Sequence, residues 1–173
     1  QTTAAHEAEV VGLAASAPGV TGTHPARNIA VESGSERTYS VVGDCVALRV
    51  EADLGDCADG DAFFVVPAKG GTAPAGKVRL RSSLHDSEEI GPEWTVPGSV
   101  EVVRSDTVAA TAEGTMLITP GALGGLALPE SSVAVYVSGT GDPQALTDDV
   151  GRAVNPLAWH AAVSKSDYLD DFA

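Results

Sequence analysis

The stretch GDCVALRVEADLGDCADGDAFFV, residues 43–65, contains both cysteines of the chain and five of its aspartates. A disulfide-stapled structural element, a metal-binding loop or a redox site would each place these residue types close together. Asp44 stands where an N-cap would begin a helix over residues 45–54, and Gly55 follows the end of that helix. The apolar run over residues 62–67 is bounded by turn residues and is typical of a buried strand.

The two cysteines predict a disulfide bond. Cys45 and Cys57 are twelve positions apart, with no C-x-x-C motif and no third ligand, which disfavours zinc and thioredoxin-type chemistry. Two such cysteines in an acidic chain indicate one disulfide formed in an oxidising compartment. Bridged Cα atoms must lie within about 7 Å, whereas a straight helix over residues 45–54 would rise about 13.5 Å. The bond therefore requires a helix of about two turns, or residues 55–57 that double back tightly, and would contribute roughly 3 kcal/mol.

Acidic residues gather in two places and raise the question of a metal. Asp53, Asp56, Asp59 and Asp61 crowd one loop, and residues 85–89 (HDSEE) form a second cluster. Oxygen ligands suit Ca²⁺, but the spacing D-x-x-D-x-x-D-x-D is not that of an EF-hand loop. We interpret the first cluster as a solvated acidic turn and predict no metal ligands, while calcium binding by residues 53–61 stays an open alternative.

The charge balance excludes some partners. The chain has 24 acidic and 10 basic residues, for a net charge of −14, which repels nucleic acid and anionic lipid headgroups. Its many Ala, Gly, Val and Asp residues and single Met suggest a GC-rich, actinobacterial genome. The chain begins at Gln1 without a signal peptide, and no stretch approaches the ~20 apolar residues that cross a bilayer. We therefore expect it to be part of a longer protein.

Catalytic motifs are missing from the sequence. It contains no G-x-S-x-G elbow, no HExxH, no phosphate-binding loop and no dinucleotide fingerprint. A Ser–His–Asp set can be assembled on paper from any chain so rich in Ser and Asp, so that pattern is uninformative. We predict a protein that is not an enzyme, with no catalytic residue and no cofactor. The isolated histidines are interpreted as surface or strand residues: His6, His24, His85 and His160.

The order of predicted elements indicates an α+β fold. Hydrophobic periodicity, caps and turn residues predict helices, strands and one polar loop over 83–97. Besides the elements already described, these are helices over 4–16 and 142–154, a helical turn over 121–126, and strands over 27–32, 37–42, 77–82, 99–103, 107–112, 115–120, 131–139 and 159–166. The strand, helix and strand at the C-terminal end form a βαβ unit. This order fits a mixed two-lobed domain better than a doubly wound sheet.

The lobes are predicted within a single domain, residues 1–173. Lobe one comprises residues 1–62 with 109–173 and joins the first helix and strand to the C-terminal βαβ unit. Residues 63–108 form a small β-rich insertion.

Several segments resemble the extracytoplasmic domain of FtsX-like, MacB-type ABC transporter permeases. The helix that ends in APGVTGTHPARNIAV, residues 17–31, is similar to the "helix, PGV, strand" opening of that domain. MLITPGAL, residues 116–123, resembles the family's strand followed by P-x-x-L. The other similar segments, together covering most of the chain, are RTYSVVGDCVALR (37–49), CADGDAFFVVP (57–67), GKVRLRS (76–82) and EWTVPGSVEVV (93–103), as in actinobacterial members, and VAVYVSGTGDPQALTDDVGRAV (133–154), as in the family's closing unit.

The resemblance implies a position and a role. The domain would lie on the extracytoplasmic face of the cell membrane, between the first two membrane helices of the permease, which this sequence lacks. A cytoplasmic ATPase would act on it indirectly, and it would contact an extracellular protein or a lipid-like substrate. The family offers no catalytic residue or nucleotide site to carry over. The short polar middle over 83–97 indicates a reduced second lobe, which weakens the inference to a MacB-like tunnel with an outer-membrane partner.

Two other functions remain as alternatives. One is a free-standing secreted binding or inhibitor module. The other is a secreted hydrolase of unfamiliar type, which would need Ser, His and Asp in contact within a pocket.

Overall fold

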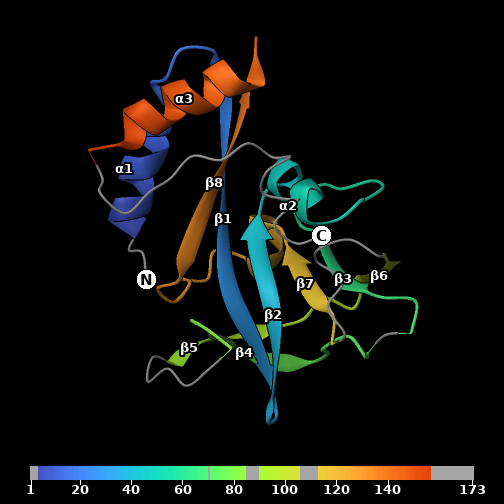
Figure 1. Ribbon diagram of the computed structural model, residues 1–173. Coiled ribbons are helices and arrows are strands. Elements are labelled where there is room, and N and C mark those ends of the chain that lie inside the picture. Colours follow the sequence, from blue (N-terminus) through green and yellow to red (C-terminus); the bar gives the residue numbers. More distant parts are fainter. Residues whose placement is uncertain (1–3, 70, 85–89, 106–112, 157–173) are drawn as a thin grey trace. The chain divides into compact units, whose positions relative to one another are not determined.

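The protein has an α+β fold, as the sequence predicts (Figure 1). The structure, a computed structural model, describes residues 4–69, 71–84, 90–105 and 113–156. The described elements are α1 (Ala4–Ala15), β1 (Val20–Ser33), β2 (Glu36–Gly43), α2 (Cys45–Glu51), β3 (Ala62–Val66), β4 (Lys77–Arg81), β5 (Ile90–Thr95), β6 (Glu101–Arg104), β7 (Thr115–Ile118), the 3-10 helix η1 (Pro120–Leu123), β8 (Ser132–Gly139) and α3 (Pro143–Val154).

All of the described strands belong to one mixed sheet. Its order is β5-β4-β1-β2-β7-β3-β6, and β8 also pairs with β1. The pairs β2–β7 and β3–β6 are parallel, whereas β1–β2, β1–β4, β3–β7 and β4–β5 are antiparallel. The parallel pairs join segments far apart in the sequence, so the fold depends on long-range contacts.

One hydrophobic core lies against the sheet. It brings Val78 of β4 and Trp94 of β5 together with Phe64 of β3, although β5 and β3 stand near opposite ends of the strand order. The Trp94 Nε1–H group also donates to the carbonyl oxygen of Ala122 in η1, at 3.0 Å. The sheet therefore curves around its core. The other buried members of the cluster are Ile29, Val31, Val42, Val66, Leu80, Val96, Met116, Ile118 and Leu123.

The predicted strands are largely correct in position but not in extent. β1 begins at Val20 and runs through Pro25, seven residues before the predicted start at residue 27. The polar loop predicted over 83–97 is wrong, because β5 forms there. Pairing with β4 and the burial of Trp94 outweigh the polar residues beside it. The strands predicted over 107–112 and 159–166 lie outside the described residues.

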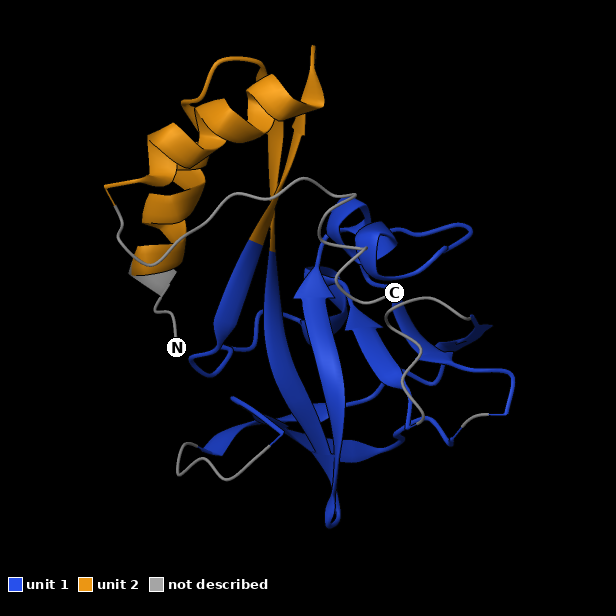
Figure 2. Cartoon of the chain, viewed as in Figure 1, with its two compact units in different colours: residues 1–2, 26–134 blue, residues 3–25, 135–173 orange. Residues whose placement is uncertain are grey.

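Contacts divide the described residues into two compact units. Unit 1 comprises residues 26–134, and unit 2 comprises 4–25 with 135–156 (Figure 2). The boundaries thus differ from the predicted lobe limits at 62/63 and 108/109. Residues 63–108 belong to the same unit as β2, because β3 pairs with β7 and β4 pairs with β1 within a continuous sheet.

Unit 2 has a small core of its own between its two helices. Ala14, near the C-terminal end of α1, and Ala17, two residues beyond that end, pack with Val150 and Val154 of α3. Asp142 caps α3 as predicted, since its carboxylate accepts a hydrogen bond from the Ala145 N–H group at 3.0 Å. The helices are therefore held by a short apolar stripe and one well-formed cap.

Gly114 supplies a test of the packing in unit 1. A Cβ atom at Gly114 would collide with the ring of Phe64, whose exposed fraction is 1%, and the φ angle of Gly114 is +88°. An alanine at this positive φ angle has a backbone cost of its own. We expect Gly114→Ala to lower the free energy of unfolding by about 1–3 kcal/mol more than this backbone cost, because of the collision with Phe64. Gly34→Ala is the matched control, because φ is +62° there but nothing lies within 4 Å. Urea denaturation measures both, and equal losses would contradict the packing argument.

Candidate functional site

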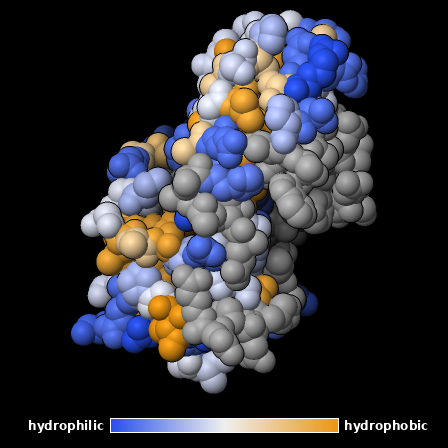
Figure 3. Space-filling model, turned by 90° about the vertical axis from the view of Figure 1, so that its left-hand side faces the viewer, coloured by the Kyte–Doolittle hydropathy of each residue, from blue (hydrophilic) through white to orange (hydrophobic). Residues whose placement is uncertain are grey.

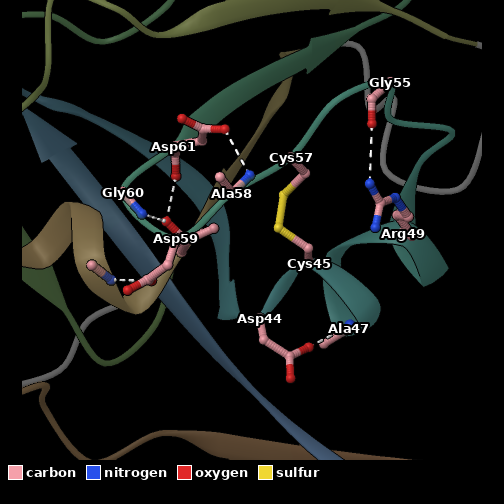
Figure 4. The surroundings of a disulfide bond; sticks show 12 residues. Asp44, Cys45, Ala47, Arg49, Gly55, Cys57, Ala58, Asp59, Gly60 and Asp61 are labelled. Atoms are coloured by element: carbon pink, nitrogen blue, oxygen red, sulfur yellow. Dashed lines mark hydrogen bonds between the residues drawn. A yellow bond between two sulfur atoms is a disulfide. The ribbon is translucent and has the colours of Figure 1, made fainter.

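The disulfide predicted from the sequence is present. Cys45 and Cys57 are bonded, and their Cα atoms lie 5.9 Å apart (Figure 4). The geometric condition for the bond is met because α2 has only seven residues, about two turns, rather than the ten of the predicted 45–54 helix. Ala52 adopts an extended conformation and ends the helix, which lets the chain return toward Cys45.

Local contacts hold α2 in place beside the disulfide. The Asp44 carboxylate accepts a hydrogen bond from the Ala47 N–H group at 2.9 Å, which confirms the predicted N-cap. The guanidinium of Arg49, in the last turn of the helix, donates to the carbonyl oxygen of Gly55, which lies beyond the helix, at 3.2 Å. Ala47 and Leu48 are fully buried, and α2 contacts β2. The stapled segment is therefore fixed at both ends.

The turn that follows Cys57 is bound to the start of η1, and we call residues 58–61 the docked turn (Figure 4). The Gly121 N–H group donates to Asp59 Oδ1 at 2.7 Å. The Gly60 N–H group donates to Thr119 Oγ1 at 2.9 Å, and that hydroxyl donates in turn to the carbonyl oxygen of Asp61 at 2.7 Å. The Thr119 N–H group donates to the same carbonyl oxygen at 3.1 Å. These contacts join segments about sixty residues apart.

Two of the four aspartates of this loop, Asp59 and Asp61, accept hydrogen bonds from backbone groups. Besides Asp59, the Asp61 carboxylate accepts a hydrogen bond from the Ala58 N–H group at 2.8 Å. Within the part of the chain that the structure describes, no group of three or more His, Cys, Asp or Glu side chains could hold a metal ion. The arrangement thus favours a structural turn over the calcium site that the sequence leaves open for residues 53–61.

A Ser–His contact occurs in unit 2 and bears on the hydrolase alternative. His24 Nε2 lies 3.1 Å from Ser138 Oγ, between β1 and β8. Facing polar side chains on paired strands commonly form such bonds. Sequence reasoning interpreted His24 as an isolated strand residue and missed the contact, because 114 positions separate it from Ser138. No local motif would reveal a pair that only strand pairing brings together.

Exposed apolar side chains are scattered rather than gathered. Among the described residues, the large exposed ones are Val46 in α2, Leu84 after β4, Ile90 in β5 and Val102 in β6. On the face drawn in Figure 3, the coloured residues likewise show separate small apolar areas among hydrophilic ones. Single exposed apolar residues are ordinary on protein surfaces, so none of them marks a docking site by itself.

The disulfide should contribute measurably to stability. We expect the double variant Cys45→Ser, Cys57→Ser to lose about 3 kcal/mol of unfolding free energy, because its unfolded chain is no longer cross-linked. Asp44→Ala is a useful comparison, since losing the N-cap of the same helix costs only about 1 kcal/mol. Urea denaturation of the oxidised wild type and both variants measures the difference. Equal stability of wild type and double variant would show that the disulfide does not contribute to the free energy of unfolding.

Ser138 is expected to be unreactive. A fluorophosphonate probe should leave it unlabelled, because the Ser138–His24 contact has the form of a structural pair between strands. Peptide mapping after incubation with the probe measures this. Labelling of Ser138 that disappears in His24→Gln but persists in Asn28→Gln, a control on the same strand, would instead support a hydrolase.

Comparison with known proteins gives no relative: no family model matches the chain, and no curated protein or solved structure is significantly similar to it. Among the described residues, no helix is long and apolar enough to cross a membrane.

Proposed function

We propose that this chain is the extracytoplasmic domain of an ABC transporter permease of the FtsX-like, MacB type. In this role it performs no chemistry. It moves with the membrane helices, which a cytoplasmic ATPase drives, and handles a protein or lipid-like substrate outside the cell. The resemblance of residues 17–31 and 133–154 to the opening and closing segments of that family's domain supports the proposal.

The observation that carries the proposal is the path of β1 and β8. Each strand has one part in unit 2 and the other in unit 1. The Thr140 N–H group donates to the carbonyl oxygen of Gly19 at 3.0 Å, and Asn28 bonds to Ser132 at 3.3 Å. Residue numbers rise along β1 while they fall along β8, so the two strands are antiparallel.

This pairing suits the transmission of force. Hydrogen bonds of an antiparallel pair lie perpendicular to the strands. A displacement directed along β1 and β8 therefore loads many bonds together rather than one at a time. The helices α1 and α3, which precede β1 and follow β8, pack through their own apolar cluster. A movement applied to either helix is thereby passed to both strands.

The disulfide supports the cellular location. Cys45 and Cys57 are bonded, and the described part of the chain has no free cysteine. Disulfides persist outside the cytoplasm and are rare within it. This observation agrees equally with a secreted binding or inhibitor module, so the permease proposal is supported over that alternative by the strand path and the sequence resemblance.

The sequence flanking residues 1 and 173 in the complete gene tests the proposal most directly. We expect about 20 apolar residues on each side, because both flanks would enter the bilayer. In intact cells, a membrane-impermeant maleimide should label a cysteine introduced at the exposed Gln144, and the protein without that cysteine is the control because its described part has no free cysteine. Polar flanks, or labelling only after the cells are lysed, would rule the permease domain out.

The mechanical role predicts an effect of the unit 2 core. In the complete reconstituted transporter, Val150→Asp should uncouple substrate handling from ATP hydrolysis, since a charge replaces a buried side chain between α1 and α3. Gln144→Asp places the same charge on an exposed position of α3 and should leave coupling intact. Simultaneous ATPase and transport assays measure it, and equal coupling in the two variants would argue against force transmission through unit 2.

A further inference from the structure

The docked turn contains the only Asp–Gly or Asn–Gly step in the sequence, Asp59–Gly60. Such steps are chemically labile because glycine has no Cβ atom to hinder ring closure on its own nitrogen. We propose that Asp59–Gly60 is a latent site of spontaneous isoaspartate formation, which the docking of this turn on Thr119 and Gly121 holds in check. The proposal does not depend on the function proposed above.

The reaction needs no reagent other than water. The Gly60 nitrogen attacks Asp59 Cγ, and a new C–N bond forms. One carboxyl oxygen leaves as water together with the amide proton and a second proton that the carboxylate takes up from solvent. The resulting five-membered succinimide is opened by a water molecule at either of its two carbonyl carbons. Opening at one carbonyl restores aspartate, whereas opening at the other runs the backbone through the former side chain and gives isoaspartate. The overall change is an isomerisation, with one water lost and one regained.

The structure restrains both reacting groups. The nucleophile is held because the Gly60 N–H group is bonded to Thr119 Oγ1 at 2.9 Å. The electrophile is held because Asp59 Oδ1 accepts from the Gly121 N–H group at 2.7 Å. The Asp59 carboxylate also fills the space beside Gly121, where a Cβ atom would lie 2.6 Å from Asp59 Cγ. Ring closure therefore requires the turn to leave its docking site.

Undocking is a local opening, and its population sets the rate of the reaction. The opening must break the two bonds of Asp61 with Thr119 as well as those of Asp59 and Gly60. It is further limited by Cys57, two positions before Asp59, which is tied to Cys45 in α2. Reduction of the disulfide should therefore accelerate the modification.

Isoaspartate formation prevents the turn from docking again. Isoaspartate lengthens the backbone by one methylene and shortens the carboxylate side chain by the same group. The carboxylate and the Gly60 N–H group then no longer match the spacing of Gly121 and Thr119. A turn that has opened and isomerised cannot dock again as before, so the site records earlier openings of the loop.

The experiment follows isoaspartate at position 59 during incubation at physiological temperature and neutral pH. The samples are the native protein, the reduced protein, Gly121→Ala and a synthetic peptide of residues 57–62 with serine in place of cysteine. Peptide mapping by mass spectrometry with electron-transfer fragmentation locates the product. We expect the peptide to react fastest and the native protein slowest. Gly121→Ala keeps the backbone N–H group, but its Cβ atom would displace the Asp59 carboxylate from it. This variant should react roughly fivefold faster than native, the change in open population for the loss of one hydrogen bond.

Matched controls separate undocking from general destabilisation. Gly98→Ala adds a Cβ atom to a glycine with nothing within 4 Å and should react at the native rate. Thr119→Val removes the hydroxyl that bonds Gly60 and should accelerate the reaction. Thr115→Val removes a buried hydroxyl that has no hydrogen-bond partner, and it should therefore leave the reaction at the native rate. The proposal is overturned if the native protein reacts as fast as the peptide. It is also overturned if Gly121→Ala reacts no faster than Gly98→Ala, a comparison that holds even where a threonine variant does not fold.

Discussion

The structure depends on one strand that serves two sets of partners. From Ala26 onward, β1 pairs with β2 on one edge, and residues 30–32 pair with β4 on the other. Before Ala26, β8 is the one described strand that pairs with it. Pro25 stands at this change and has no N–H group to donate to a neighbouring strand. At Pro25 the several strands that pair around β1 give way to the single pair of β1 with β8. The boundary between the two units within β1 lies at the same place, between Pro25 and Ala26.

The second organising feature is the connection between the disulfide and the docked turn. The Cys45–Cys57 disulfide limits the path of residues 52–57. The docked turn then binds Thr119 and Gly121, which follow the C-terminal end of β7. Each contact contributes little by itself, since a typical hydrogen bond is worth about 1 kcal/mol. Together they close the path from α2 into β3, whose side chains are buried at all five positions. Two short segments therefore position a fully buried strand that lies between β7 and β6.

Local chemistry was predictable from the sequence, whereas pairing was not. The Asp44 and Asp142 caps and the Cys45–Cys57 bond follow from residue type and spacing over a dozen positions, although the helix predicted over residues 45–54 ends at Glu51. The extension of β1 through Pro25 and the formation of β5 do not, because both depend on partners elsewhere in the chain. The same limit applies to the site. The loop's aspartates were visible as a cluster, but Gly121, whose N–H group donates to the Asp59 carboxylate, is 62 positions away.

The position of β8 and α3 late in the chain has a consequence for how the protein is made. Synthesis proceeds from the N-terminus, and domains generally fold as units when their residues become available. Unit 1 can assemble once β7 and η1 have emerged, but α1 and the first part of β1 must wait for β8 and α3. During this interval α1 exists without its packing partner. Its run of small residues and the glutamates at positions 7 and 9 limit the apolar surface that it exposes while it waits.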